Sequence, residues 1–134
     1  MAIMSTKNLI RAAAFLMFAC AILHSLAWGR AQADFAPEVR PLVALLWFLL
    51  GIDWAVIAGI WVLGASQGVA ARRLLLLSAV IPIAVAVGLI LTIGPGFVPV
   101  YLQLGAAALV VLGALRLSDR VPLRDSSAAG GGLA

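Results

Sequence analysis

Residues 41–63 read PLVALLWFLLGIDWAVIAGIWVL, and the only charged side chain in this apolar run is Asp53. An α-helix needs about 20 mostly apolar residues to cross a hydrocarbon core roughly 30 Å thick. The run is therefore long enough to span a lipid bilayer. Asp53 comes about 12 residues into it, on the order of 18 Å along a helix and close to the middle of the membrane.

Three further apolar runs accompany this segment, separated by short stretches of glycine, proline and polar residues. Gly94-Pro95-Gly96 is a strong helix stop, and Ser66-Gln67-Gly68 predicts a turn. The sequence predicts an all-α, four-helix transmembrane bundle, running up-down-up-down with short connections, within residues 1–117. The expected helices cover about 8–28, 41–63, 71–93 and 97–117. Residues 118–134 are polar and then rich in alanine and glycine, which predicts a disordered tail.

The composition fits one membrane domain. Of the 134 residues, 65% are hydrophobic and 10% are charged, against about 25% charged in soluble proteins. The net charge of +4 comes from residues that border the apolar runs, so it does not indicate a nucleic-acid partner. Lys7 is the only lysine among nine basic residues, and this arginine bias with abundant Ala, Leu, Val and Gly is typical of a GC-rich genome. We therefore expect a multi-pass protein of a bacterial inner membrane.

The basic residues also predict an orientation. They gather before the first run, between the second and third, and after the fourth, at Lys7, Arg11, Arg72, Arg73, Arg116, Arg120 and Arg124. The first loop balances two arginines against Asp34 and Glu38, and the loop around Pro95 has no charge. Because basic loops stay in the cytoplasm, both termini are expected there.

Small residues indicate how the helices pack. Gly51, Ala55 and Gly59 recur at four-residue spacing, a pattern that lets transmembrane helices approach closely. At 100° per residue, Asp53 points almost opposite to this ridge. We therefore expect its carboxyl to face another helix, a cavity or a second protomer.

Two interpretations of Asp53 remain open. A charged carboxylate at mid-membrane costs about 2.5–3.5 kcal/mol on insertion scales, so such residues face protein or water and often carry function. Asp53 would then bind a proton or a cation. Alternatively, a protonated carboxyl would only hydrogen-bond a neighbouring helix. The expected partners lie near Cys20 or Pro82, because Pro82 leaves the carbonyl of Ser78 free. The expected depths separate Asp53 from His24, so no salt bridge between them is expected.

Further candidate binding residues lie at the outer level of the predicted bundle. They come from three helices and are His24, Trp47, Tyr101 and Gln103. They could line an outward-facing pocket, with His24 contacting helix 97–117 near Gln103 or helix 41–63 near Trp47. They could equally form the aromatic belt of a membrane interface. Trp54 belongs to a stripe with Trp47 and Trp61, which would suit either a groove for a planar or lipid-like ligand or ordinary packing.

The residues offer little for catalysis or metal binding. Cys20 and His24 share a helix face, but a closed zinc site needs about four ligands and only Asp53 could add a third within the membrane. A single histidine cannot clamp a haem from both sides. No known catalytic motif is present. We therefore expect no cofactor and no metal, and an enzyme is the least favoured function.

Two functional hypotheses follow. The first is a non-enzymatic membrane protein that acts through helix packing, as an accessory subunit of a larger complex or as a homo-oligomer. The alternative is a small proton-coupled transporter or membrane binding protein for an apolar or cationic ligand, using Asp53 and a pocket near His24. Both place the chain in contact with lipid.

Overall fold

The computed structural model describes residues 4–117, and the predicted tail over 118–134 lies outside this range. The prediction of an all-α protein is confirmed. The elements are α1 (Thr6–Ala31), a short 3-10 helix η1 (Gln32–Asp34), α2 (Arg40–Gln67), a second 3-10 helix η2 (Gly68–Ala71), α3 (Arg72–Thr92) and α4 (Pro99–Arg116).

Local sequence explains where these helices begin and end. The Ser5 hydroxyl caps α1 by accepting a hydrogen bond from the backbone N–H of Asn8 at 3.3 Å. Prolines open α2 and α4, where a missing N–H costs nothing. The chain leaves α3 through Gly94, whose φ of 105° suits glycine. In contrast to the expected turn at Ser66-Gln67-Gly68, α2 continues through Gln67, and the chain turns within η2.

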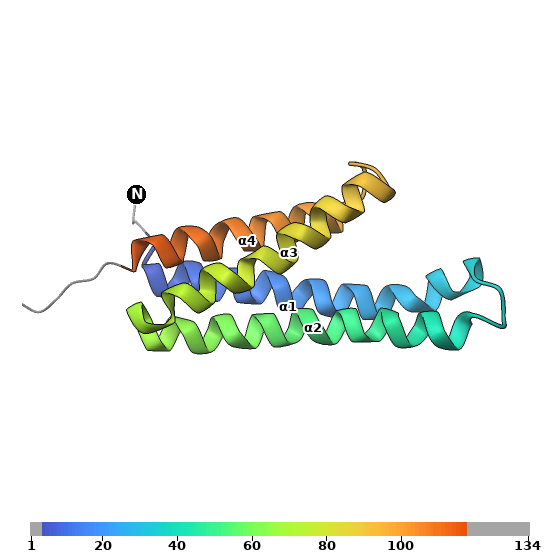
Figure 1. The fold of residues 1–134 in the computed structure, drawn as a ribbon, viewed down its shortest axis with the longest axis horizontal. Helices are drawn as coiled ribbons and strands as arrows, with labels where there is room; N and C mark the ends of the chain where they lie inside the picture. The colour runs from blue at the N-terminus through green and yellow to red at the C-terminus, as the bar shows by residue number, and fades with distance from the viewer. Residues whose placement is uncertain (1–3, 118–134) are drawn as a thin grey trace, which may run out of the picture.

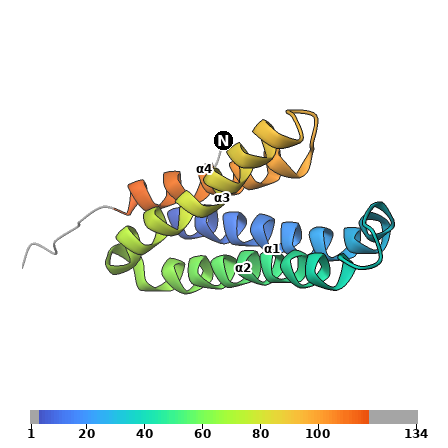
Figure 2. The ribbon, with the colours of Figure 1, turned by 45° about the vertical axis from the view of Figure 1, so that its right-hand side comes forward.

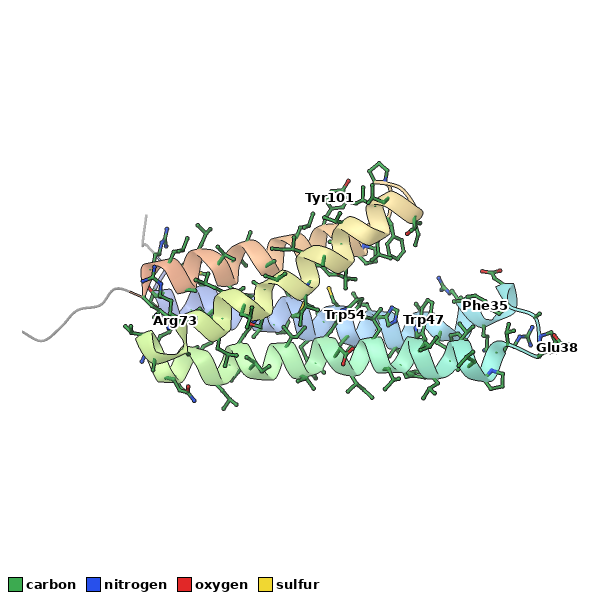
Figure 3. All side chains as sticks on the ribbon, in the orientation of Figure 1. Phe35, Glu38, Trp47, Trp54, Arg73 and Tyr101 are labelled. Carbon is green, nitrogen blue, oxygen red and sulfur yellow. The ribbon has the colours of Figure 1, made fainter. Side chains whose placement is uncertain are left out.

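Helical structure is continuous from Arg40 to Thr92, because η2 joins α2 directly to α3. Within residues 4–117, and with this 53-residue run counted once, three helical segments are long and apolar enough to cross a membrane: Thr6–Asp34, Arg40–Thr92 and Pro99–Arg116. Their length and composition identify a small multi-pass membrane protein. Arg73 lies at the opposite end of the molecule from Glu38, as Figure 3 shows.

The four α-helices of the described chain can be viewed as two pairs, α1 with α2 and α3 with α4, which α1 and α4 join by packing along each other (Figure 1). The pairs lie close together at the end that contains η2 and the start of α1. Towards the other end they diverge, so that the α3–α4 connection stands away from the α1–α2 connection in both views (Figure 2). We call the joined end the closed end and the other the open end.

The predicted small-residue ridge on α2 packs at only one of its two glycines. Gly51 is buried, and a Cβ there would lie 3.0 Å from Ser25 Oγ of α1. Gly59 is exposed, with nothing within 4 Å of its Cβ position. The closest approaches lie at the closed end instead, where Gly113 of α4 contacts Ile10 and Gly64 of α2 contacts Leu75.

Candidate functional site

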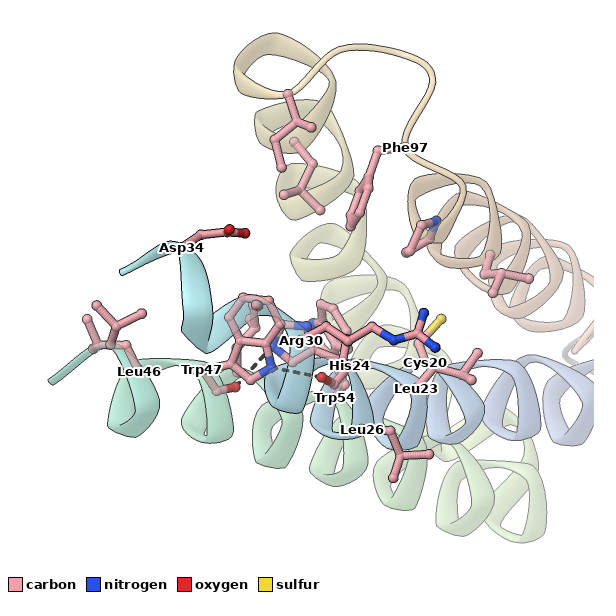
Figure 4. A pocket seen from close by; sticks show the side chains of 18 residues that line it. Cys20, Leu23, His24, Leu26, Arg30, Asp34, Leu46, Trp47, Trp54 and Phe97 are labelled. Carbon is pink, nitrogen blue, oxygen red and sulfur yellow. Dashed lines mark hydrogen bonds between the residues drawn. The ribbon is translucent and has the colours of Figure 1, made fainter. Parts of the chain in front are cut away.

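A cavity of about 880 Å³ occupies the space between the two helix pairs at the open end. We call it the outer cavity. Phe97, from the α3–α4 connection, projects towards α1 across this space (Figure 4). Most of the lining is apolar, and the principal contributors are Cys20, Leu23 and His24 of α1, Trp47, Leu50 and Trp54 of α2, and Leu89, Ile93, Phe97 and Leu102 beyond them.

His24 and Trp47 hold α1 and α2 together beside this cavity. His24 Nε2 donates to the Trp47 carbonyl oxygen at 3.0 Å, and Trp47 Nε1 donates to the His24 carbonyl oxygen at 2.7 Å. The rings stack with centroids 4.3 Å apart and planes 7° apart. This reciprocal arrangement, which we call the clasp, is one of the two contacts expected for His24.

The clasp fixes the hydrogen-bonding character of His24. A carbonyl oxygen only accepts, so the proton of the neutral ring is on Nε2. The other nitrogen, Nδ1, makes no hydrogen bond with any side chain or backbone group of residues 4–117. The buried polar side-chain atoms without a partner in residues 4–117 belong to Trp54 and Gln103. Because His24 Nδ1 has no partner and is not one of them, it is accessible. His24 therefore offers an acceptor beside the cavity.

Trp54 has a different role from the other members of its stripe. Its side chain is only 2% exposed, and its ring centroid lies 4.9 Å from that of His24. Within the described chain, its buried Nε1 has no hydrogen-bond partner. Seven residues further along, Trp61 Nε1 donates to Ser78 Oγ at 2.8 Å. A buried donor without a partner costs about 1–3 kcal/mol, so the Trp54 N–H requires an explanation.

Gln103 is a second buried polar group without a partner. Its side chain is 0% exposed, and neither Oε1 nor Nε2 bonds to another described residue. It does not line the outer cavity, although its neighbour Leu102 does. Since α1 and α4 are antiparallel and Ile10 contacts Gly113, ten residues along each helix place Gln103 at the level of Cys20. Gln103 therefore lies near the depth at which the cavity ends.

Tyr101 and Asp53 lie outside the cavity. The Tyr101 side chain points away from α1 and α2 (Figure 3), and its hydroxyl donates to the Pro95 carbonyl oxygen at 2.6 Å. Asp53 is exposed on α2, and no hydrogen bond joins it to any of residues 4–117. The expected pairing of Asp53 near Cys20 or Pro82 is therefore wrong. Asp53 has no partner on α3 because α3 diverges from α2 at this depth.

Of the six candidate residues, the structure brings His24, Trp47 and Trp54 together and leaves Asp53, Tyr101 and Gln103 apart. Sequence reasoning missed the contribution of the α3–α4 connection, especially Ile93 and Phe97. The available signal was their position on either side of Gly94-Pro95-Gly96, because apolar residues beside a tight connection can turn back towards a bundle. It also missed Arg30 and Asp34, which line the cavity near the α1–α2 loop.

Comparison of the chain with protein families, curated proteins and solved structures gave no match.

Proposed function

We propose that this protein is a membrane-embedded binding protein that holds a lipid-like molecule in the outer cavity. The observation that carries the proposal is Trp54, whose side chain lines the cavity and whose buried Nε1–H has no partner within the described chain. A small rotation of the indole would bring this donor to an oxygen acceptor of a ligand, which would supply the missing hydrogen bond. This proposal develops the binding alternative and gives less weight to action through helix packing alone.

The chemistry of the cavity limits what would bind. Its volume of about 880 Å³ lies within the roughly 300–1,000 Å³ of small-molecule sites. The walls are aliphatic and aromatic, which suits a hydrocarbon chain or ring. Trp54 Nε1 supplies a donor, and the free Nδ1 of His24 supplies an acceptor. The preferred ligand is thus an apolar molecule with a small uncharged head, such as a hydroxyl, that accepts one hydrogen bond and donates another.

Trp54→Phe tests the proposal, with Trp61→Phe as its matched control. Binding of tritiated octadecanol to the purified protein in micelles should weaken about tenfold in Trp54→Phe, the equivalent of one lost hydrogen bond of about 1.4 kcal/mol. Trp61→Phe should leave the affinity within about twofold, because its N–H bonds to Ser78 and lies outside the cavity.

Stability should show the reverse order. Trp61→Phe loses a made hydrogen bond as well as ring contacts, so its unfolding free energy should fall by about 2 kcal/mol. Trp54→Phe also removes an unpartnered buried donor, which offsets part of its loss and should keep the change within about 1 kcal/mol. Equal octadecanol affinity in the wild type and Trp54→Phe, or no saturable binding to the wild type, would overturn the proposal.

The proposed orientation is a four-helix bundle in a bacterial inner membrane, with both termini in the cytoplasm and the open end outside. Its support is the concentration of basic residues at the closed end, including Arg72 and Arg73. A reporter fused after Leu117 should be cytoplasmic, whereas one inserted near Asp34 should be external. Alkaline phosphatase and green fluorescent protein fusions measure this directly. Phosphatase activity from the C-terminal fusion would contradict the orientation.

Self-association is the second candidate function, and the exposure of Asp53 favours it. A mid-membrane carboxyl is costly in contact with lipid, and a second copy of the chain would cover it. Two copies inserted in the same direction would place their Asp53 residues at the same depth, where protonated carboxyls can bond to each other. Proton-coupled transport is not proposed, because no hydrogen bond among residues 4–117 links Asp53 to the cavity.

A further inference from the structure

We infer that the ligand of the proposed binding function reaches the outer cavity sideways from the bilayer, through a gap between α2 and α3 beside Asp53. The two helices touch near the closed end. There, a Cβ on Gly64 would lie 2.7 Å from Leu75 Cδ2, and Trp61 Nε1 bonds to Ser78 Oγ at 2.8 Å. Beyond these contacts α3 leaves α2 and continues beside α4 (Figure 1).

The helical phase of α2 places Asp53 on the edge of this gap. Asp53 precedes Gly64 by 11 residues, so at 100° and 1.5 Å per residue it points within about 20° of the same direction and lies about 16 Å closer to the open end. It thus lies on the flank of α2 that contacts α3 at Gly64. Asp53 is exposed because, at its depth, α3 lies away from α2.

The cavity opens along the same flank. Leu46 lies two helical turns from Asp53 on one stripe, and it lines the cavity although it is 57% exposed. A residue can do both only where the cavity wall meets the outer surface. On the other side of the gap, two residues line the cavity. They are Leu89 of α3 and Ile93, which directly follows α3.

The surroundings of this opening indicate where the ligand comes from. Exposed side chains near it are apolar, with Leu49 on α2 and Ile93 directly after α3 as examples. Apart from Asp53, the ionisable side chains at the opening lie at the end nearest the α1–α2 loop, at Arg30 and Asp34. A molecule dissolved in hydrocarbon can thus reach Trp54 without crossing water. One from the aqueous phase would have to pass Arg30 and Asp34.

Cysteine labelling at the edge of the gap tests this route. Asp53→Cys would be labelled with a fluorescein maleimide, and loading of tritiated octadecanol from nanodisc bilayers would be followed with time. Loading should slow by at least about tenfold, which corresponds to about 1.4 kcal/mol on the barrier, while the final occupancy changes little. Ile52→Cys is the matched control, because Ile52 is 57% exposed at nearly the same depth but points about 100° away, on the side opposite Trp54.

The remaining arms separate the possible outcomes. A label on Arg30→Cys blocks the aqueous route. Slower loading of octadecanol in this labelled variant than in labelled Asp53→Cys would overturn the inference. Equal loading of labelled Asp53→Cys and Ile52→Cys would do the same while leaving the proposed binding function intact. Oxidation of unlabelled Asp53→Cys provides a third arm. A disulfide between two copies that forms in most molecules would show that a second chain covers this flank, and would replace the inference with self-association. The unsubstituted protein controls for Cys20, which is buried.

Discussion

Replacing His24 with leucine is expected to lower the free energy of unfolding by about 2 kcal/mol. The substitution removes the Nε2 hydrogen bond to the Trp47 carbonyl, worth about 1 kcal/mol, and a stacked ring pair worth about 0.5–1.5 kcal/mol. Hydrogen bonds between transmembrane helices have comparable strengths, about 0.6 kcal/mol on average and up to about 1.7. Reversible unfolding by sodium dodecyl sulfate in bicelles would measure the change.

A double-mutant cycle would assign this loss to the clasp. Trp47→Phe keeps an aromatic ring against His24 but removes the Nε1 donor to the His24 carbonyl oxygen, so it should lower stability by about 1 kcal/mol. The double variant should lose less than the sum of the two single variants, because both act on one contact. Additive losses would mean that His24 and Trp47 stabilise the protein independently.

Replacing Gly113 with valine is expected to lower the free energy of unfolding by about 3 kcal/mol. A Cβ at this position would lie 2.6 Å from Ile10 Cγ1, so the Ile10 side chain would have to move, and the valine methyl groups would add to this crowding. Gly59→Val is the matched control, because its Cβ would meet nothing within 4 Å. The same detergent titration should find the control within about 0.5 kcal/mol of the wild type.

A second substitution identifies the cause of this loss. If the clash with Ile10 is responsible, Ile10→Ala should recover part of the stability in the Gly113→Val background, although Ile10→Ala alone should cost about 2–4 kcal/mol. Two independent losses would instead assign the effect of Gly113→Val to a change in α4 itself.

The helices were predictable because each is long, apolar and bounded by polar or helix-breaking residues. Their exact ends were less so. Residues 29–31 follow Trp28 without a proline, and α1 continues through them to Ala31. Likewise Ser66 and Gln67 remain helical, because nothing prevents α2 from continuing until Gly68, whose φ is 66°. A polar residue suggests the end of an apolar run but does not break a helix.

The depth of the site residues along the helices was predictable, but the neighbours that their side chains face were not. Counting residues along the helices placed His24 at the level of Trp47, where the structure finds the clasp. The same counting placed Asp53 near Pro82, yet the two have no hydrogen-bonded contact because α3 diverges. Periodicity within one helix does not encode the angle between two helices. The tryptophan stripe gives the same lesson, since Trp47, Trp54 and Trp61 share a spacing but have three different environments.

The divergence of the two helix pairs also affects the lipid around the protein. Because the pairs are joined at one end and separate towards the other (Figure 2), a chain of this shape in a bilayer would have a larger cross-sectional area in one leaflet than in the opposite one. Any movement that brought α3 towards α2 would shrink that area in a single leaflet. The protein is thus shaped as a wedge, and a wedge that spans a bilayer would pack best where the leaflet at its wide end is expanded by curvature.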